Sequence, residues 1–351
     1  MSKITVLIVD DSLTMRAIIK SVLAADREVN VIGEAADAYE AREKVKSLNP
    51  DVLLLDVEMP KMSGIEFLEK VMSLRPMPVV MLSGSTKRGA KDTIEALRLG
   101  AFECLEKPSS SNYISGLSNL GAVLKAAVRH GTRSPNLHAA EEGPSSRDVS
   151  YTPDNSIIGI GSSTGGVEAL MKILSKFPKN CPPVVITQHM PELFLESFAD
   201  RLNRSVKPTV QLAADGDVLQ SGHVYLGPGG DNHLEIHGRR RFHCQLKSSD
   251  PVSGHRPSVD VMFSSMARAA KGRGIGVILT GLGRDGAQGL LTMRQAGAKT
   301  IGQDEQSCIV YGMPKVAAEI GALENQIPLH LIGNRLLDMS CKTQSKTIVS
   351  Q

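Results

Sequence analysis

The chain has 351 residues, 41% hydrophobic and 22% charged, a length typical of two domains of roughly 150 residues each. Its 40 basic and 37 acidic side chains give a formal charge of +3, which is too even a balance to indicate a nucleic-acid-binding surface. No run of about 18 uncharged apolar residues is present, which excludes a transmembrane helix and membrane insertion.

The chain begins MSKITVLIVDDS, a segment too short and too acidic for a signal peptide, so we expect a cytoplasmic protein. The five cysteines are scattered and form no CxxC pair, which favours reduced thiols over disulfides or a zinc site. The absence of Trp and an aromatic content of 3% argue against stacking platforms for single-stranded nucleic acid.

Over the first 130 residues, short apolar runs alternate with amphipathic stretches of helical length. Most of these runs are nearly continuously apolar, which is typical of strands buried on both faces of a parallel sheet. The pattern predicts five βα units in a doubly wound sheet, where ligands bind at the carboxyl ends of the strands. The expected strands are residues 4–9, 29–32, 52–55, 79–82 and 102–105.

Polar residues follow four of these strands and predict a phosphoryl pocket. Asp10 and Asp11 follow the first strand and Asp56 the third, and oxygen-only ligands of this kind suit Mg²⁺. Ser83 and Lys107, after the fourth and fifth strands, would hold phosphoryl oxygens, with Asp56 as the acceptor. Each residue alone could be a helix cap, a turn residue or a solvated lysine. Their occurrence at successive strand ends favours function.

The motifs VLIVDDS, LLLDVEMPKMSG, VVMLSGST and LEKP resemble the response-regulator receiver family over roughly residues 1–129. The resemblance implies phosphorylation of Asp56 by a partner histidine kinase, with Mg²⁺ as cofactor. One residue departs from the family pattern: Cys104 occupies the position where receivers usually carry an aromatic switch residue.

Residues 130–154 are polar and punctuated by prolines, and we expect a linker there. Apolar runs at 157–160, 184–187 and 276–280 predict a second α/β domain over residues 155–335, followed by a polar tail at 336–351. Within that domain, closely spaced runs separated by Gly-rich turns predict antiparallel hairpins beside the main sheet. These runs are residues 210–212, 223–226, 233–236 and 242–246.

Residues 161–165, Gly-Ser-Ser-Thr-Gly, fit the GxSxG pattern between a strand and a helix and make Ser163 a candidate nucleophile. Alone, such a turn more often caps a helix or binds phosphate. His189 directly follows the next strand, and Asp285 follows the strand at 276–280. Three strands thus bring a nucleophile, a general base and an orienting acid to one edge of the sheet.

A competing pattern overlaps this site. Gly281, Gly283 and Gly286 spell GxGxxG after a strand, with Asp304 near the distance expected of a dinucleotide fingerprint. Asp285 would lie inside the turn that should receive the pyrophosphate, where a second negative charge is repelled. Residue patterns alone leave the dinucleotide site open as the weaker alternative.

The motifs IIGIGSSTGGVEAL, VVITQHMPELFLESFADRLN, GHRPSVDVMFSS, GVILTGLGRDGAQGL and VYGMPKVA resemble the catalytic domain of the chemotaxis protein-glutamate methylesterase family. The resemblance implies hydrolysis of glutamate methyl esters on methylated chemoreceptors, often with deamidation of receptor glutamines, and no cofactor in this domain. It also implies that the unphosphorylated receiver covers the active-site face.

The expected reaction is acyl transfer in which Ser163 attacks the ester and His189 takes its proton. Thr164 and Leu282 are candidate donors of oxyanion N–H groups. The loop containing His255 could meet an acidic receptor helix, or it could be a solvated turn. A second domain that only binds, with no chemistry, is the alternative of a different class. A DNA-binding output is weaker, because no helix-turn-helix pattern is present.

Overall fold

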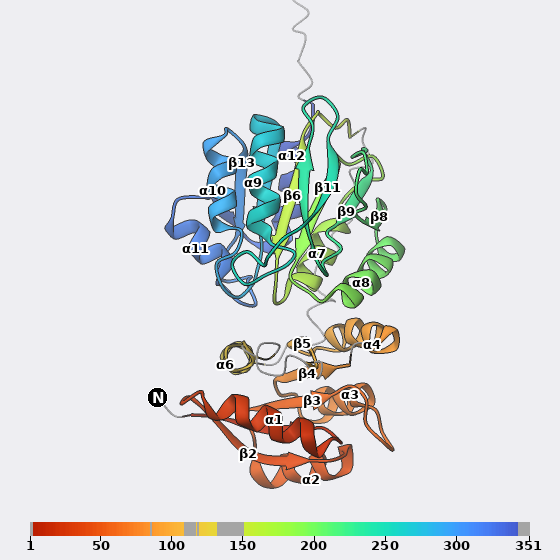
Figure 1. The fold of residues 1–351 in the computed structure, drawn as a ribbon, viewed down its shortest axis with the longest axis vertical. Coiled ribbons are helices and arrows are strands. Elements are labelled where there is room, and N and C mark those ends of the chain that lie inside the picture. The colour runs from red at the N-terminus through yellow and green to blue at the C-terminus, as the bar shows by residue number, and fades with distance from the viewer. Residues whose placement is uncertain (1–2, 85, 109–116, 118, 132–150, 343–351) are drawn as a thin grey trace, which may run out of the picture. The chain divides into compact units, whose positions relative to one another are not determined.

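The computed structural model describes residues 3–84, 86–108, 117, 119–131 and 151–342. The chain divides into two compact units, residues 1–142 and 143–351, and each is built on a parallel sheet (Figure 1). Among the described helices, none combines the length and the apolar character needed to cross a membrane.

The first unit is a five-stranded parallel sheet in the order β2-β1-β3-β4-β5, which confirms the predicted receiver-type sheet. Every residue of β3 and β4 is buried, because helices cover both faces of the sheet. The strands are β1 (Ile4–Val9), β2 (Val29–Ala35), β3 (Val52–Asp56), β4 (Val79–Ser83) and β5 (Glu103–Glu106). The described helices are α1 (Leu13–Ala24), α2 (Ala38–Leu48), α3 (Gly64–Leu74), α4 (Lys87–Arg98) and α6 (Leu120–His130).

Side-chain caps fix where the first four helices begin. The oxygens of Ser12, Asp37, Ser63 and Thr86 each accept a hydrogen bond from a backbone N–H of the first turn. Ser63 and Glu66 together form a capping box. Because these helices start just after the loops at the carboxyl ends of the strands, the caps also hold those loops in place.

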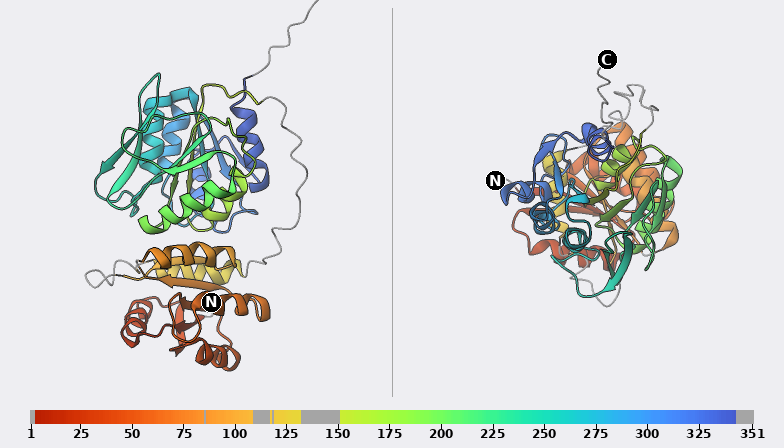
Figure 2. Two further views of the ribbon diagram at one scale, coloured as in Figure 1. Left: turned by 90° about the vertical axis from the view of Figure 1, so that its right-hand side faces the viewer. Right: turned by 90° about the horizontal axis from the view of Figure 1, so that it is seen from above.

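The second unit is a seven-stranded parallel sheet in the order β14-β13-β12-β6-β7-β9-β8. Its strands are β6 (Ile157–Ser162), β7 (Val184–Gln188), β8 (Thr209–Leu212), β9 (His223–Leu226), β12 (Gly274–Ile278), β13 (Lys299–Gln303) and β14 (Asn325–Ile327). The antiparallel hairpin of β10 (Asn232–His237) and β11 (His243–Ser248) forms the predicted addition to this sheet (Figure 2, teal).

Helices cover both faces of the second sheet. Helices α9 (Val259–Ala270), α10 (Ala287–Gln295) and α11 (Met313–Glu319) pack on one face, and η2 (Lys271–Arg273) follows α9. Helices α7 (Gly166–Leu174), α8 (Glu192–Ser205) and α12 (Leu329–Met339) pack on the other. Helix α9 packs so closely on β6 that a Cβ at Gly161 would lie 2.2 Å from Val259 Cγ1, and only glycine fits at this position.

The prediction that residues 210–212 and 223–226 form antiparallel hairpins is wrong. β8 and β9 pair in parallel with each other, and β9 pairs in parallel with β7. The connection at 213–222 returns the chain to the start of β9 by bonding to β11. Gly216 N–H donates to the carbonyl of Cys244 at 2.9 Å, and Leu219 N–H donates to that of Phe242 at 2.9 Å.

The ends of the second unit also differ from the predicted limits. α12 continues through Met339, and Leu336 and Ser340 are fully buried, so the polar tail does not begin at residue 336. Before the sheet, the Tyr151 hydroxyl lies 2.8 Å from Ser340 Oγ, and Asp154 N–H donates to the Ser340 carbonyl at 2.9 Å. The remaining parts of the predicted linker and tail, residues 132–150 and 343–351, lie outside the described residues.

Candidate functional sites

The predicted acidic residues of the first unit meet at one edge of its sheet. Asp10 follows β1 and Asp56 ends β3, and both are buried, whereas Asp11 is exposed. One carboxylate oxygen from each lies within 4.8 Å of the others, which is consistent with a metal site. An oxygen-only donor set of three acids is the kind that Mg²⁺ favours.

Lys107 lies between two of these acids. Its ammonium is 2.9 Å from Asp10 Oδ2 and 2.7 Å from Asp56 Oδ2, and its backbone N–H donates to the Ser83 carbonyl at 2.8 Å. Burial raises the pKa of Asp56 to about 6, although Lys107 acts in the opposite direction. The Ser83 side chain is buried at the end of β4, and its hydroxyl lies 3.4 Å from the Gly84 carbonyl. The structure therefore joins Lys107 directly to the acids and places Ser83 at the same edge.

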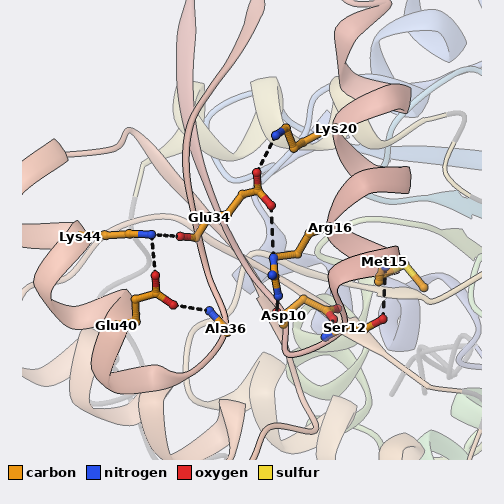
Figure 3. A network of polar contacts seen from close by, with 9 residues as sticks. All are labelled: Asp10, Ser12, Met15, Arg16, Lys20, Glu34, Ala36, Glu40 and Lys44. Atoms are coloured by element: carbon orange, nitrogen blue, oxygen red, sulfur yellow. Dashed lines mark hydrogen bonds and ion pairs between the residues drawn. The ribbon is translucent and has the colours of Figure 1, made fainter.

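An additional ion-pair network supports the loop after β1 (Figure 3). Arg16, from α1, donates to the Asp10 carbonyl at 2.6 Å and to Glu34 Oε2 at 3.2 Å. Lys20 donates to the other Glu34 oxygen at 2.6 Å, and these two cations lower the pKa of Glu34. Arg16 therefore ties α1 and β2 to the backbone of Asp10, a role that sequence reasoning missed.

Cys104 lies in β5, with its side chain directed into the core of the first unit. Its thiol lies 3.5 Å from the Thr93 carbonyl, and burial raises the pKa of the thiol well above its ordinary value. The structure therefore places at this position a buried thiol in contact with α4.

In the second unit, Ser163 occupies the turn between β6 and α7. Its backbone N–H donates to the Thr280 carbonyl at 3.1 Å, and its carbonyl accepts from Gly166 N–H at 2.7 Å and from Gln188 Nε2 at 2.9 Å. Ser163 is 9% exposed. A Cβ at Gly281 would lie 2.7 Å from Ser163 Cβ, so only glycine lets the loop after β12 pass this close to the serine.

The structure brings His189 and Asp285 into direct contact. His189 Nε2 lies 2.8 Å from Asp285 Oδ2, and the backbone N–H of His189 donates to the Ser162 carbonyl at 3.0 Å. His189 Nδ1 is buried, and no partner for it occurs in the described part of the chain. No hydrogen bond between Ser163 and His189 is found among the described residues, so the pair forms here without the third contact of a triad.

Asp285 accepts three further hydrogen bonds from the start of α9. Ser258 Oγ donates to its Oδ1 at 2.8 Å, Val259 N–H to its Oδ2 at 2.7 Å, and Asp260 N–H to its Oδ1 at 3.1 Å. Burial alone would raise the pKa of Asp285, but hydrogen bonds from His189, Val259 and Ser258 lower it to about 2. The carboxylate is therefore held as an anion at the N-terminus of α9.

His255 stacks on His189, with ring centroids 3.7 Å apart and planes 5° from parallel. Burial, and then the neighbouring His189, lower the pKa of His255 to about 4. Arg256 donates to the Gly230 carbonyl at 2.7 Å and to Asp231 Oδ1 at 2.5 Å. The segment is therefore bound to the rest of the site and is not a solvated turn, whereas its contact with a receptor stays a prediction.

Two backbone N–H groups beside Ser163, those of Thr164 and Leu282, donate to no protein acceptor within the described chain. Thr280 fixes one side of this region, because its hydroxyl donates to the Thr164 carbonyl at 3.0 Å. Sequence reasoning missed Gln188, Thr280 and Ser258, although all three lie next to the strand ends or helix start that define the site.

The two units thus define a class of protein: a response-regulator receiver joined to an α/β domain in which Ser163, His189 and Asp285 lie at one edge of the sheet. Two family models match the chain, the "Response regulator receiver domain" over residues 6–116 and "CheB methylesterase" over residues 158–336. The crystal structure of the CheB methylesterase catalytic domain of Thermotoga maritima is similar to the second unit. The TM-score is 0.51 at 38% identity, covering 53% of this chain and 99% of that one.

Similarity to curated proteins extends over nearly the whole chain. A "Protein-glutamate methylesterase/protein-glutamine glutaminase 1" of Rhizobium johnstonii is 54% identical over 343 residues, 97% of this chain and 98% of that protein. The protein of the same description from Caulobacter vibrioides is 54% identical over 341 residues, 97% of this chain and 99% of that one. The chain belongs to the CheB methylesterase family, which removes the basis for the dinucleotide alternative.

Proposed function

We propose that this chain hydrolyses the methyl esters of glutamate side chains on chemoreceptors, and the amides of specific receptor glutamines, during chemotactic adaptation. The observation that carries the proposal is the buried His189–Asp285 pair at the sheet edge where Ser163 lies. Family membership supports the choice of substrate. The reaction takes place in the cytoplasm, which agrees with the free thiols of all five cysteines.

In the proposed reaction, Ser163 Oγ attacks the ester carbonyl and its proton passes to His189. Since Nε2 of His189 is bonded to Asp285, the nitrogen that accepts the proton is Nδ1, which has no other partner among the described residues. Methanol then leaves with that proton, and water attacks the acyl-serine to release the glutamate carboxylate and restore Ser163. The Asp285 anion stabilises the imidazolium throughout.

The oxyanion of the tetrahedral intermediate would be held by the backbone N–H groups of Thr164 and Leu282. Both groups lack a protein acceptor in the described chain and lie in the loops that flank Ser163. Backbone donors that the fold holds in place would need no reorganisation when this charge develops. No cofactor is needed, because every proposed group is supplied by the protein.

The first unit would receive a phosphoryl group on Asp56 from a chemotaxis histidine kinase. Asp10, Asp11 and Asp56 would hold Mg²⁺, which when bound offsets the charge of the transferred phosphoryl group. Lys107 and Ser83 would contact the phosphoryl oxygens. We assign the receiver to the expected residues 1–129, extended by the last residue of α6. The methylesterase covers the expected residues 155–335 together with residues 151–154 and the end of α12, and the linker lies between the two units.

Methanol release from methylated chemoreceptor membranes tests this function. Wild-type protein and Ser163→Ala are compared, each with and without Mg²⁺ and a small phosphodonor. We expect wild-type release to rise with phosphodonor and the alanine variant to release none. Full activity of Ser163→Ala would show that another residue is the nucleophile. No release by either protein from any receptor would favour a second domain that only binds.

A further inference from the structure

Residues 255–258 contact both members of the His189–Asp285 pair. His255 stacks on the imidazole of His189, and Ser258 donates a hydrogen bond to Asp285. Neither side chain takes part in the proposed proton transfer. We propose that this segment is a positioning element that holds His189 and Asp285 in the geometry that hydrolysis requires, an inference that rests on the proposed esterase mechanism.

Ser258 fixes one oxygen of Asp285. Its fully buried hydroxyl donates to Asp285 Oδ1 at 2.8 Å and accepts a hydrogen bond from Val261 N–H at 3.4 Å, as the N-cap of α9. A hydroxyl has only one proton to donate. Because the first turn of α9 occupies an acceptor site of this oxygen, the hydroxyl is oriented and its proton points to the carboxylate.

The backbone of Ser258 is in turn hydrogen-bonded to His233. His233 is fully buried in β10; its Nδ1 accepts a hydrogen bond from Ser258 N–H at 3.1 Å, and its Nε2 lies 3.0 Å from the Asp250 carbonyl. A carbonyl only accepts, so Nε2 carries the proton and Nδ1 carries none. This single neutral tautomer connects the hairpin strand β10 to Ser258 and, through it, to Asp285.

His255 fixes the plane of the other ring. Val252 and His255 exchange two backbone hydrogen bonds of 3.0 Å each, which close a tight turn, and the neighbouring Arg256 is anchored to the Gly230 carbonyl at 2.7 Å. The turn is therefore built before substrate arrives. With its face covered by His255 and its Nε2 held by Asp285, the His189 ring has one orientation, which sets the direction of Nδ1.

The stack also fits the charge that develops on His189. When His189 takes the proton of Ser163, the imidazolium lies against the face of the His255 ring. A second charged imidazole at this distance would repel it, so the stack requires His255 to be neutral. Burial and the neighbouring His189 lower the pKa of His255 to about 4, so the stacked ring carries no charge at neutral pH.

The test compares paired variants of the full chain. Ser258→Ala removes the donor and Ser258→Thr keeps it, whereas His255→Leu removes the ring and His255→Phe keeps one. Ser265→Ala is the matched serine control, because this buried α9 hydroxyl bonds to Met262 and Ile236 and not to Asp285. His223→Leu is the histidine control, since His223 stacks on Tyr225 away from the site.

Three quantities are measured for each variant: kcat and KM for methanol release, the thermal unfolding midpoint, and the ring ¹⁵N chemical shifts of His189. We expect Ser258→Ala to lower kcat about tenfold to a hundredfold, the loss of one hydrogen bond to a charged group, with little change in KM. His255→Leu should lower kcat about twofold to tenfold, the loss of one ring stack. The ¹⁵N shifts should move in both. Ser258→Thr and His255→Phe should recover most of kcat, and neither control should change kcat or the shifts.

The positioning role is overturned if folded Ser258→Ala and His255→Leu match the two controls in kcat and in ¹⁵N shifts. If Ser258→Ala does not fold, Ser258→Gly replaces it, because glycine is a favourable N-cap without a hydroxyl. The esterase mechanism and the positioning role of residues 255–258 can be refuted independently of each other. Activity in Ser163→Ala would overturn the mechanism, whereas the ¹⁵N shifts need no substrate and report the His189–Asp285 geometry in either case.

Discussion

Asp56 in the receiver and Asp285 in the catalytic unit are both buried carboxylates near the carboxyl ends of parallel strands. Their pKa values move in opposite directions. Burial, together with the neighbouring Asp10 carboxylate, raises the pKa of Asp56 to about 6, although Lys107 and the backbone N–H of Glu58 lower it. Asp285 has four hydrogen-bond donors, including the start of α9, and its pKa falls to about 2. Because both carboxylates are buried, the difference between their pKa values comes from the donors and charges around each group rather than from its depth of burial.

This difference suits the two proposed tasks. A carboxylate whose lone pairs are occupied by protein donors is a fixed anion, which is what an orienting acid must be. A carboxylate with few protein donors keeps lone pairs for a cation and a phosphoryl group. A carboxylate near the end of a parallel strand can therefore form a functional site, and the hydrogen-bond donors around it determine which chemistry that carboxylate can perform.

The largest expected effect comes from removing the fixed anion. Asp285→Asn should lower kcat for methanol release by about 10³- to 10⁴-fold, because the amide cannot stabilise the imidazolium or hold the required tautomer. Asp154→Asn is the matched control, since its Oδ1 accepts Ser156 N–H at 2.7 Å before the start of β6 and an amide oxygen can do the same. An Asp285→Asn variant with near-wild-type kcat would contradict the assigned role.

The two aspartates should also respond oppositely in stability. The folded pKa of Asp285, about 2, lies below the ordinary 3.8, so its ionisation stabilises the fold above pH 3.8 and this stabilisation is lost as pH falls toward 2. At pH 7, Asp285→Asn should therefore reduce the free energy of unfolding by about 2 kcal/mol. The folded pKa of Asp56, about 6, lies above 3.8, so the wild type loses stability as pH rises from 3.8 to 6.

Asp56→Asn should accordingly raise the free energy of unfolding at pH 7 by about 1 to 3 kcal/mol, and this gain should shrink toward pH 4. Calorimetry of the full-length chain in metal-free buffer, at pH 7 and at pH 4.5, measures the free energy of unfolding of both variants. The deficit of Asp285→Asn should persist at pH 4.5, where that carboxylate is still ionised. Shifts of the same sign in the two variants at pH 7 would refute the contrast between the two sites.

The smallest expected effect concerns the support of the acidic pocket. Arg16→Gln should lower the free energy of unfolding of the receiver by about 1 kcal/mol, because the Asp10 carbonyl and Glu34 lose a charged donor. Lys46→Gln is the control, since its exposed pair with Glu43 should contribute almost nothing. Equal calorimetric shifts in both variants would show that Arg16 is only a surface charge.

The strand ends were predictable because the signal is local. A continuous apolar run followed by a polar residue identifies a buried strand and its end, and this placed Asp10, Asp56, Ser163 and His189 correctly at sheet edges. The pairing of β8 with β9 was not predictable in this way. Its direction depends on residues 213–222 bonding to β11, which comes later in the chain.

The donors around Asp285 were missed for a related reason. Ser258 reads in sequence as an ordinary N-cap before α9, and nothing nearby in the chain shows that its proton points to a residue 27 positions away. The same holds for Gln188, whose side chain reaches the turn of Ser163 from the neighbouring strand. Sequence pattern located the candidate nucleophile and its partners, whereas the groups that hold them come from distant segments.

The contacts between Tyr151 and Ser340 have a consequence for the modularity of this enzyme. The first and last described segments of the catalytic unit lie side by side. Pro153 forms a β-bridge with Cys341, and Lys342 N–H donates to the Thr152 carbonyl at 3.0 Å. A fold whose two ends meet can be joined to another domain at either end without rearranging its sheet. The gene order of regulator and enzyme is then free to change in evolution, and a short link between these ends gives a circular permutant with the catalytic sheet intact.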